Sequence, residues 1–309
     1  TQRISPGMII EAERDTLAVR SVFGFPEEPG VDIQVVVRRF NLATKFSAAA
    51  QEEARRASRR IGAADRAGRQ DYRRWTTVTI DGESAKDFDD AVSIRRLPSG
   101  NFLLGVHIAD VSHYVRPGSA LDKEALDRAT SVYLPEFTIP MLPEELSNNI
   151  CSLRGRQVRL TVSALLEIDG QGRTVKADFH PSLIKTAERM TYDSVFKIFQ
   201  GDAAEIERYR KLVPDFLMMR ELAAILRRRR ESLGSLNFDL LEPELIYQEG
   251  TLHRVAAFET NEAHHLIEEF MVLANEAVAD ELSRKGIPAL CRIRPPPAPA
   301  DIAELKVLL

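Results

Sequence analysis

The chain has 309 residues, with 42 Lys and Arg against 46 Asp and Glu and a formal net charge of -4 at pH 7. This balance is typical of a soluble globular protein and argues against a nucleic-acid binder that works through a uniformly basic surface. Two cysteines, Cys151 and Cys291, are too few for a disulfide framework or a structural zinc site. With no signal-peptide pattern and no apolar run of about 20 residues, the sequence predicts a cytoplasmic protein without a membrane span.

The first 75 residues are predicted to precede the main domain. Residues 1–40 have β-type patterning, including the alternating segment 31–40. We interpret residues 1–30 as the remnant of an upstream β domain of OB-fold or cold-shock type. Residues 31–75 would form a joining strand and a basic helical segment, with a helix over 47–67 that Gly68 ends.

The basic segment stands out against the acidic average. Two aspartates, Asp65 and Asp71, oppose eight arginines there: Arg55, Arg56, Arg59, Arg60, Arg66, Arg69, Arg73 and Arg74. Such a row is most often a solvated helix face, but it is also the charge pattern that guides an RNA backbone.

Residues 76–309 are predicted to form an α+β domain, a mixed β-sheet flanked by helices. Strands are expected at 76–81, 91–97 and 102–115, and a long hairpin at 157–180. Helices are expected at 121–130, 194–200, 214–230 and 264–283, while 138–149 is expected to be loop. Strands and helices do not alternate strictly, which favours α+β over a doubly wound sheet.

A cluster of carboxylates lies between the first two of these strands. Asp81, Asp87, Asp89 and Asp90 fall within ten residues, and their charges would repel one another strongly at neutral pH unless a cation compensated them. Mg²⁺ prefers carboxylate oxygens and is usually completed by substrate phosphate. The sequence therefore predicts a divalent-metal site for phosphoryl chemistry at a strand end.

Other interpretations of the acidic cluster fit less well. An EF-hand loop would need a third ligand and a glycine where Ala91 and Val92 stand. A phospho-aspartyl site would need an apolar strand running into Asp87. The pair Asp81 and Glu83 resembles the first motif of another class of metal-dependent exonuclease, which would leave the other aspartates without a role. An acidic surface loop remains the purely structural alternative.

Four segments in order carry a resemblance to a known family. They are 79–91 (TIDGESAKDFDDA), 105–115 (GVHIADVSHYV), 129–153 (ATSVYLPEFTIPMLPEELSNNICSL) and 263–275 (AHHLIEEFMVLAN). Together they resemble the catalytic domain of the ribonuclease II / ribonuclease R exoribonuclease family over about 29–309, closer to ribonuclease R. The resemblance implies processive, Mg²⁺-dependent 3′-to-5′ hydrolysis of single-stranded RNA to nucleoside 5′-monophosphates by two metal ions, with Mn²⁺ as a possible substitute.

The resemblance also implies roles for individual residues. The family's metal-site aspartates fall on Asp81, Asp87, Asp89 and Asp90, and Asp89 is expected to be catalytic as well. Tyr192 and Glu268 match further active-site residues. The aromatic residues that stack on RNA bases fall on Tyr133 and Phe238; stacking of this kind is indifferent to base sequence.

The predicted helix after Thr260 allows a test by helical geometry. Its apolar stripe, built around Ile267 and Phe270, leaves Glu268 on the flank, where it would reach a cleft, and leaves Glu269 in solvent. The histidines His107, His113 and His264 are expected to satisfy hydrogen bonds in the core.

The chain also departs from the family pattern. Ser84 stands where an acid is common, and the segment 292–299 replaces a usual His-Asp-Lys-Pro run. The family's downstream arginine segment and RNA-binding domain are not in this sequence, so we expect a catalytic domain truncated at its C-terminus. The alternatives are an RNA-binding fragment or scaffold with an idle catalytic site, and a metal-dependent exonuclease of another fold.

Overall fold

The computed structural model describes residues 4–134, 137–235, 242–248, 251–291, 293 and 295–308. Its centre is a seven-stranded mixed sheet with strand order β11-β4-β5-β6-β9-β10-β3. The two outer pairs, β11 with β4 and β10 with β3, are parallel, and the others are antiparallel. The strands of this sheet are β3 (Gln70–Asp71), β4 (Val78–Asp81), β5 (Asp90–Arg96), β6 (Phe102–Ala109), β9 (Val158–Ile168), β10 (Thr174–Lys185) and β11 (Glu188–Thr191).

In the described ranges, three two-stranded ribbons accompany the sheet: β1 (Ile9–Ala12) with β2 (Val19–Gly24), β7 (Val132–Leu134) with β8 (Phe137–Ile139), and β12 (Glu242–Gln248) with β13 (Thr251–Phe258). The helices of the N-terminal half are α1 (Val31–Arg39), α2 (Ala48–Ala57), α3 (Ala63–Arg66), α4 (Val111–Tyr114), α5 (Ala120–Arg128) and the π-helical turn η1 (Leu146–Ile150). Those of the C-terminal half are α6 (Tyr192–Phe199), α7 (Ala203–Arg208), α8 (Val213–Ser232), α9 (Glu262–Arg284) and α10 (Pro299–Leu308). The mixed sheet flanked by helices confirms the predicted fold class.

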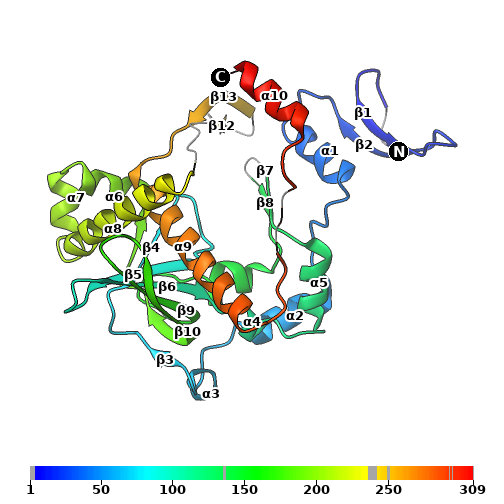
Figure 1. Cartoon of the computed structure of the whole chain (residues 1–309). Helices are drawn as coiled ribbons and strands as arrows, with labels where there is room; N and C mark the ends of the chain where they lie inside the picture. The colour runs from blue at the N-terminus through cyan, green and yellow to red at the C-terminus, as the bar shows by residue number, and fades with distance from the viewer. Residues whose placement is uncertain are drawn as a thin grey trace.

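One face of the sheet carries the larger core. Helices α6, α8 and α9 pack their apolar sides onto β4, β5, β6, β9 and β10, and α9 crosses in front of the sheet (Figure 1). Phe102, Phe216 and Phe270 are fully buried in this layer. A second core lies under α2, α5 and η1, around Leu121 and Leu146. Ile80 and Val92 belong to the first core, whereas Phe88 of the intervening acidic loop belongs to the second, so the loop lies where the two cores meet.

The opposite face of the sheet has a buried polar row. His107 is fully buried; its Nε2 lies 3.0 Å from the Ser93 hydroxyl and its Nδ1 lies 2.6 Å from that of Ser163. Tyr72 covers the row and hydrogen-bonds His180. Burial lowers the pKa of His107 to about 3, so the ring is neutral. The expectation that His107 satisfies core hydrogen bonds is confirmed.

The segment 31–40, predicted as a strand, forms helix α1 instead, so that prediction was wrong. Its alternating valines suggested β structure, but Asp32 in the first turn and Arg38 and Arg39 in the last match the helix dipole. Gly30, with φ 79°, lets the chain turn into the helix and Val31 is buried.

Two further predictions were wrong. The segment 138–149, predicted to be loop, contains most of β8 and η1. The strand predicted over 102–115 ends at Ala109, and helix α4 follows it.

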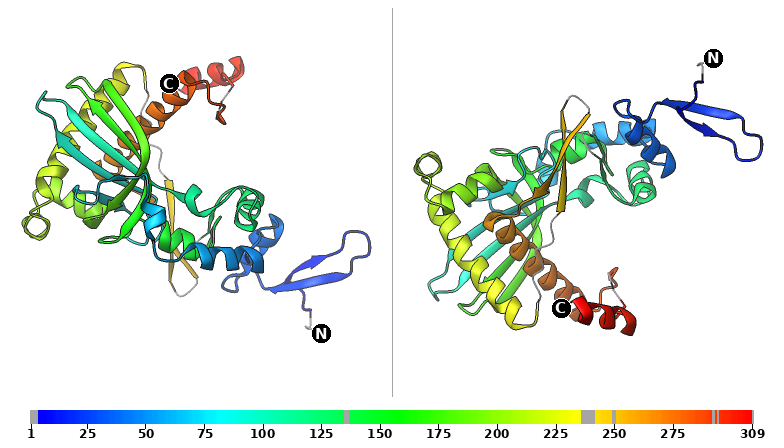
Figure 2. Two further views of the ribbon diagram at one scale, coloured as in Figure 1. Left: turned by 90° about the horizontal axis from the view of Figure 1, so that it is seen from below. Right: turned by 90° about the horizontal axis from the view of Figure 1, so that it is seen from above.

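The termini lie away from the sheet. The β1–β2 hairpin projects from the body next to α1, and α10 follows a stretch of irregular chain after α9 (Figure 2). No helix in the described ranges is both long and apolar enough to cross a membrane.

Candidate active site

The four aspartates meet where β4 ends and β5 begins. Asp81 is the last residue of β4 and Asp90 the first of β5, and these strands are antiparallel neighbours. Ser152 fixes the loop between them: its hydroxyl accepts from the Phe88 amide at 3.1 Å and donates to the Lys86 carbonyl at 2.8 Å. The loop is therefore anchored from the chain that follows η1, and its carboxylates are held together by the backbone.

Arg189 fastens the other side of the same loop. It lies on β11, whose parallel register with β4 sets Thr191 opposite Asp81. Its Nη2 donates to the carbonyls of Gly82 at 2.6 Å and Glu83 at 2.8 Å. Sequence reasoning missed Arg189, although it stands three residues before Tyr192.

The electrostatics of the cluster favour bound positive charge. Burial and the neighbouring carboxylates, Asp90 first among them, raise the pKa of Asp81 to about 7 despite the opposing effect of Arg189. Asp89 keeps an exposed surface, yet partial burial and the charges of Asp87 and Asp90 raise its pKa to about 6. Burial also raises the pKa of Asp90. Without a cation, the folded protein disfavours full ionisation of this cluster.

The donor set fits a hard divalent cation. One carboxylate oxygen of Asp81, Oδ2, is buried and has no hydrogen-bond partner among the residues that the structure describes. Within the part of the chain that the structure describes, no three His, Cys, Asp or Glu side chains already form an arrangement that could hold a metal ion. Mg²⁺, however, is commonly bound through one or two carboxylates, with waters and substrate phosphate completing its shell. An all-protein cage is therefore not required.

Two of the predicted aromatic residues lie beside the cluster. The Tyr133 hydroxyl on β7 donates to Asp87 Oδ2 at 3.3 Å, although 69% of the residue is exposed. Tyr192 begins α6 immediately after β11; burial, followed by the charges of Asp81 and Asp90, raises its pKa to about 12. Its ring stacks on His264, with centroids 3.9 Å apart. Phe238 lies outside the described residues.

The two glutamates of α9 are placed differently from the helical-wheel expectation. Glu269, predicted to be solvated, is only 4% exposed, so that prediction was wrong. The apolar layer between α8 and α9 is wide enough to include it, and Arg230 of α8 compensates its charge at 2.8 Å. Glu268 is half exposed and bonds the same Arg230 at 3.1 Å, with His265 at 3.5 Å. The structure therefore brings Asp81, Asp87, Asp89, Asp90, Tyr133 and Tyr192 together, and gives Glu268 an arginine partner instead.

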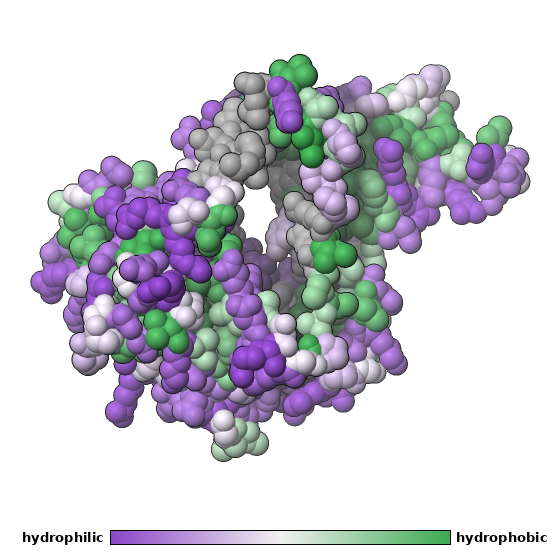
Figure 3. All heavy atoms as spheres, viewed as in Figure 1, coloured by the Kyte–Doolittle hydropathy of each residue, from purple (hydrophilic) through white to green (hydrophobic). Residues whose placement is uncertain are grey.

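The space-filling view shows an opening in the molecule (Figure 3). In the space-filling view, an opening separates the helical side of the molecule, covered mainly by hydrophilic residues, from the side that carries α10 and the β7–β8 hairpin (Figure 3). Tyr133 belongs to that hairpin and reaches Asp87. The hairpin thus leans toward the acidic loop.

Sequence relatives point to one family. A family model described as the RNB domain matches residues 69–309. Ribonuclease R of Thermotoga maritima is 43% identical over 308 residues, covering 98% of this chain and 42% of that protein. Ribonuclease R 1 of Lactococcus lactis is 42% identical over 280 residues, covering 90% of this chain and 34% of that protein. The chain thus spans about two fifths or less of the length of these relatives.

Solved structures with the same fold include a ribonuclease R, in agreement with the sequence relatives. Mycoplasma genitalium RNase R in complex with ribose-methylated single-stranded RNA has a TM-score of 0.87 at 27% identity, over 99% of this chain and 49% of that one. Yeast Ssd1, described as a pseudonuclease, shares the fold with a TM-score of 0.74 at 17% identity, over 97% of this chain and 38% of that one. With its acidic loop, mixed sheet and sequence relatives in agreement, this chain belongs to the RNB domain family.

Proposed function

We propose that this chain carries the catalytic domain of a 3′-to-5′ exoribonuclease that hydrolyses single-stranded RNA processively to nucleoside 5′-monophosphates. The observation that carries the proposal is Asp81: one of its carboxylate oxygens is buried and has no hydrogen-bond partner among the described residues. Burial, together with the nearby charges of Asp87, Asp89 and Asp90, contributes to the raised pKa of Asp81. Carboxylates kept together at such a cost to stability are characteristic of functional sites. Membership of the RNB family and relatives named ribonuclease R support the choice of RNA as substrate.

The donor set assigns a role to a metal. We propose that the site binds two Mg²⁺ ions, with Mn²⁺ as a substitute. The residues that would hold them are Asp81, Asp87, Asp89 and Asp90. When bound, the ions supply neutralisation of the phosphodiester charge and activation of water for in-line displacement.

The protein's own groups position the RNA. Tyr133 presents an exposed ring next to the acidic loop, and a base stacked on such a ring gains about 1–3 kcal/mol whatever its identity. Tyr192 stays protonated at neutral pH, so its hydroxyl donates a hydrogen bond to a phosphate or ribose oxygen. Phe238 would complete the base stack and Glu268 would help to position the scissile end, once released from Arg230.

The direction of hydrolysis and its dependence on metal can be tested together. RNA of one sequence is labelled at the 5′ end or at the 3′ end and incubated with the protein and Mg²⁺. We expect the 3′ label to appear at once as mononucleotide, while the 5′ label passes from full-length RNA to a short end product without intermediates building up. EDTA should stop both. Internal cleavage or cleavage in EDTA would contradict the proposal.

A second function, an RNA-binding domain with an idle site, is favoured by one observation. Glu268 is engaged by Arg230, and no described hydrogen bond or ion pair links it to the aspartates. The fold alone does not decide between the two functions, because yeast Ssd1 shares it. Metal-independent RNA binding with no mononucleotide released over hours in Mg²⁺ would favour this second function.

A further inference from the structure

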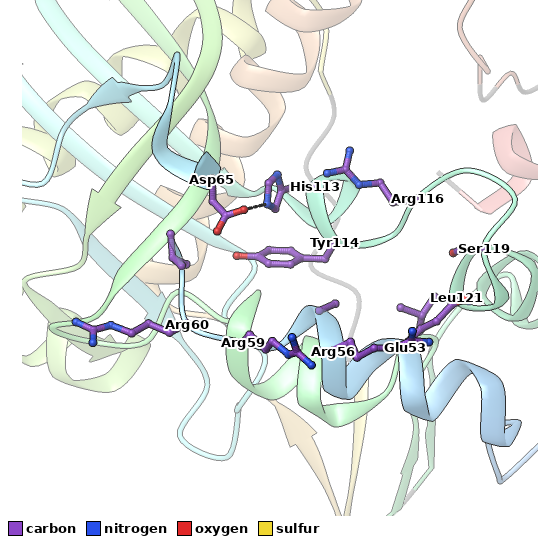
Figure 4. Close-up of a pocket in the computed structure, with 12 residues that line it drawn as sticks. Glu53, Arg56, Arg59, Arg60, Asp65, His113, Tyr114, Arg116, Ser119 and Leu121 are labelled. Atoms are coloured by element: carbon purple, nitrogen blue, oxygen red, sulfur yellow. Dashed lines mark hydrogen bonds and ion pairs between the residues drawn. The ribbon is translucent and has the colours of Figure 1, made fainter. Parts of the chain in front are cut away.

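A cavity of about 510 Å³ opens on a part of the molecule that the proposed activity does not use. Helix α2, the segment before α3, helix α4 and the start of α5 form its walls (Figure 4). None of its lining residues belongs to the acidic loop.

Arginines dominate the charge of this cavity. It is lined by Arg56, Arg59, Arg60 and Arg116, against the two carboxylates of Glu53 and Asp65. The lining of the cavity is therefore positively charged, although the whole chain has a net charge of -4.

Both carboxylates are already occupied. Glu53 accepts hydrogen bonds from the amides of Ala120 and Leu121, at 3.2 and 2.9 Å, where α5 begins. Asp65 accepts from the Gly62 amide at 2.7 Å and lies 3.0 Å from His113 Nε2. These contacts explain why the pKa values of both acids are lowered, by hydrogen bonds from the backbone first.

Three of the arginines have no such engagement. Within the described ranges, the guanidinium groups of Arg59, Arg60 and Arg116 make no hydrogen bond or ion pair, whereas Arg69 is buried against Asp110 and Arg73 pairs with Asp71. Arg59 and Arg116 lie on opposite sides of the Tyr114 ring (Figure 4). The basic segment therefore divides into structural arginines and a group that faces a cavity.

Tyr114 lines this cavity with its ring, while its hydroxyl is buried. Among the described residues, that hydroxyl has no hydrogen-bond partner. Burial, with the nearby Cys151 and Asp65, raises the pKa of Tyr114, so the hydroxyl keeps its proton at all physiological pH values. The donors that this cavity offers are therefore the guanidinium groups, whose forked geometry suits phosphate oxygens.

We propose that this cavity is a second RNA-binding site, in which Arg59 and Arg116 hold phosphates of the RNA backbone at a distance from the acidic loop. The choice of RNA as the polyanion rests on the proposed function, because that activity brings RNA to the protein. A site of this kind holds substrate through its backbone and is indifferent to base sequence.

The experiment measures binding without hydrolysis. A fluorescent single-stranded RNA of about 20 nucleotides is titrated with the 309-residue chain in EDTA between 50 and 200 mM salt. The double variant Arg59→Gln/Arg116→Gln is compared with a control, Arg74→Gln/Arg228→Gln, which removes two exposed arginines elsewhere. Each phosphate contact contributes about 0.7 to the slope of log K against log salt for single strands. We expect the slope to fall by about 1.4 in the first variant and to be unchanged in the control.

Other outcomes of these binding measurements would overturn either this inference alone or the proposed function with it. Equal slopes for the two double variants would overturn the proposal. So would loss of AMP binding in Arg59→Gln/Arg116→Gln with RNA binding unchanged, since the site would then hold free mononucleotide. If the unaltered protein does not bind RNA in EDTA, the proposed function fails together with this inference; binding without the arginine effect overturns the inference alone.

Discussion

The ring of Tyr192 stacks on the ring of His264 at a centroid distance of 3.9 Å, with the two planes 18° apart. This contact joins the start of α6, beside the acidic loop, to the start of α9. His264 also lies next to Asn261, which caps α9 through the amides of Ala263 and His264. The stack thus places Tyr192 by means of a helix that is distant in sequence.

Removal of the stacked ring should reduce activity by displacing Tyr192. For His264→Ala we expect kcat on a short RNA to fall about tenfold, with about 1 kcal/mol lost from the free energy of unfolding. His264→Phe keeps a ring and should retain most of kcat. Equal losses in both variants would show that the cap at Asn261, rather than the stack, is what matters.

Asp81 should destabilise the protein when no metal is present. Its folded-state pKa of about 7 lies above the ordinary value of 3.8, so its stabilising contribution is complete below pH 3.8 and is lost as the pH rises through 7. After allowance for partial exposure, Asp81→Asn should raise the free energy of unfolding by about 1–2 kcal/mol at pH 8 in EDTA. Thermal melting with EDTA and with Mg²⁺ provides the measurement; Mg²⁺ should stabilise the unaltered protein more than the variant.

His107 should give the opposite dependence on pH. Its folded-state pKa of about 3 lies below the ordinary 6.5, so the unfolded chain takes up a proton first as the pH falls. Its stabilising contribution is complete above pH 6.5 and declines between 6.5 and 3, by about 2 kcal/mol from pH 7 to pH 5. Urea unfolding of His107→Gln should show a correspondingly smaller loss over that range, although the variant is less stable at pH 7. The exposed His253→Gln serves as control, and should lose stability with acid as the unaltered protein does.

The neighbouring glutamates of α9 should separate function from stability. Glu269 is buried against Arg230, and burial raises the pKa of Glu269. Arg230→Gln would leave this buried carboxylate without its cationic partner and should lower the free energy of unfolding by about 2–4 kcal/mol. Glu268→Gln should leave the melting temperature nearly unchanged and lower the hydrolysis rate. A full rate in Glu268→Gln would remove this residue from the active site and leave it as a partner of Arg230.

The sequence was most informative where the pattern was local. The strands on either side of the acidic loop, the hairpin of β9 and β10, and helices α8 and α9 follow from periodicity and turn residues. Helix α1 was missed because β-branched residues outweighed its end charges. The parallel pairing of β11 with β4, which brings Tyr192 and Arg189 to the aspartates, depends on contacts between segments more than 100 residues apart. Periodicity carries no signal for such pairing, nor for the arginine that allows Glu269 to be buried.

The most direct test of the central claim is the rate of mononucleotide release in Mg²⁺ under single-turnover conditions. Three proteins are compared: the unaltered chain, Asp89→Asn, and Asp127→Asn, which makes the same change at an exposed position on α5. We predict that Asp89→Asn lowers the rate about 100-fold or more while RNA binding persists, and that Asp127→Asn matches the unaltered chain. Equal rates in all three proteins would contradict the assignment of the acidic loop as the catalytic site.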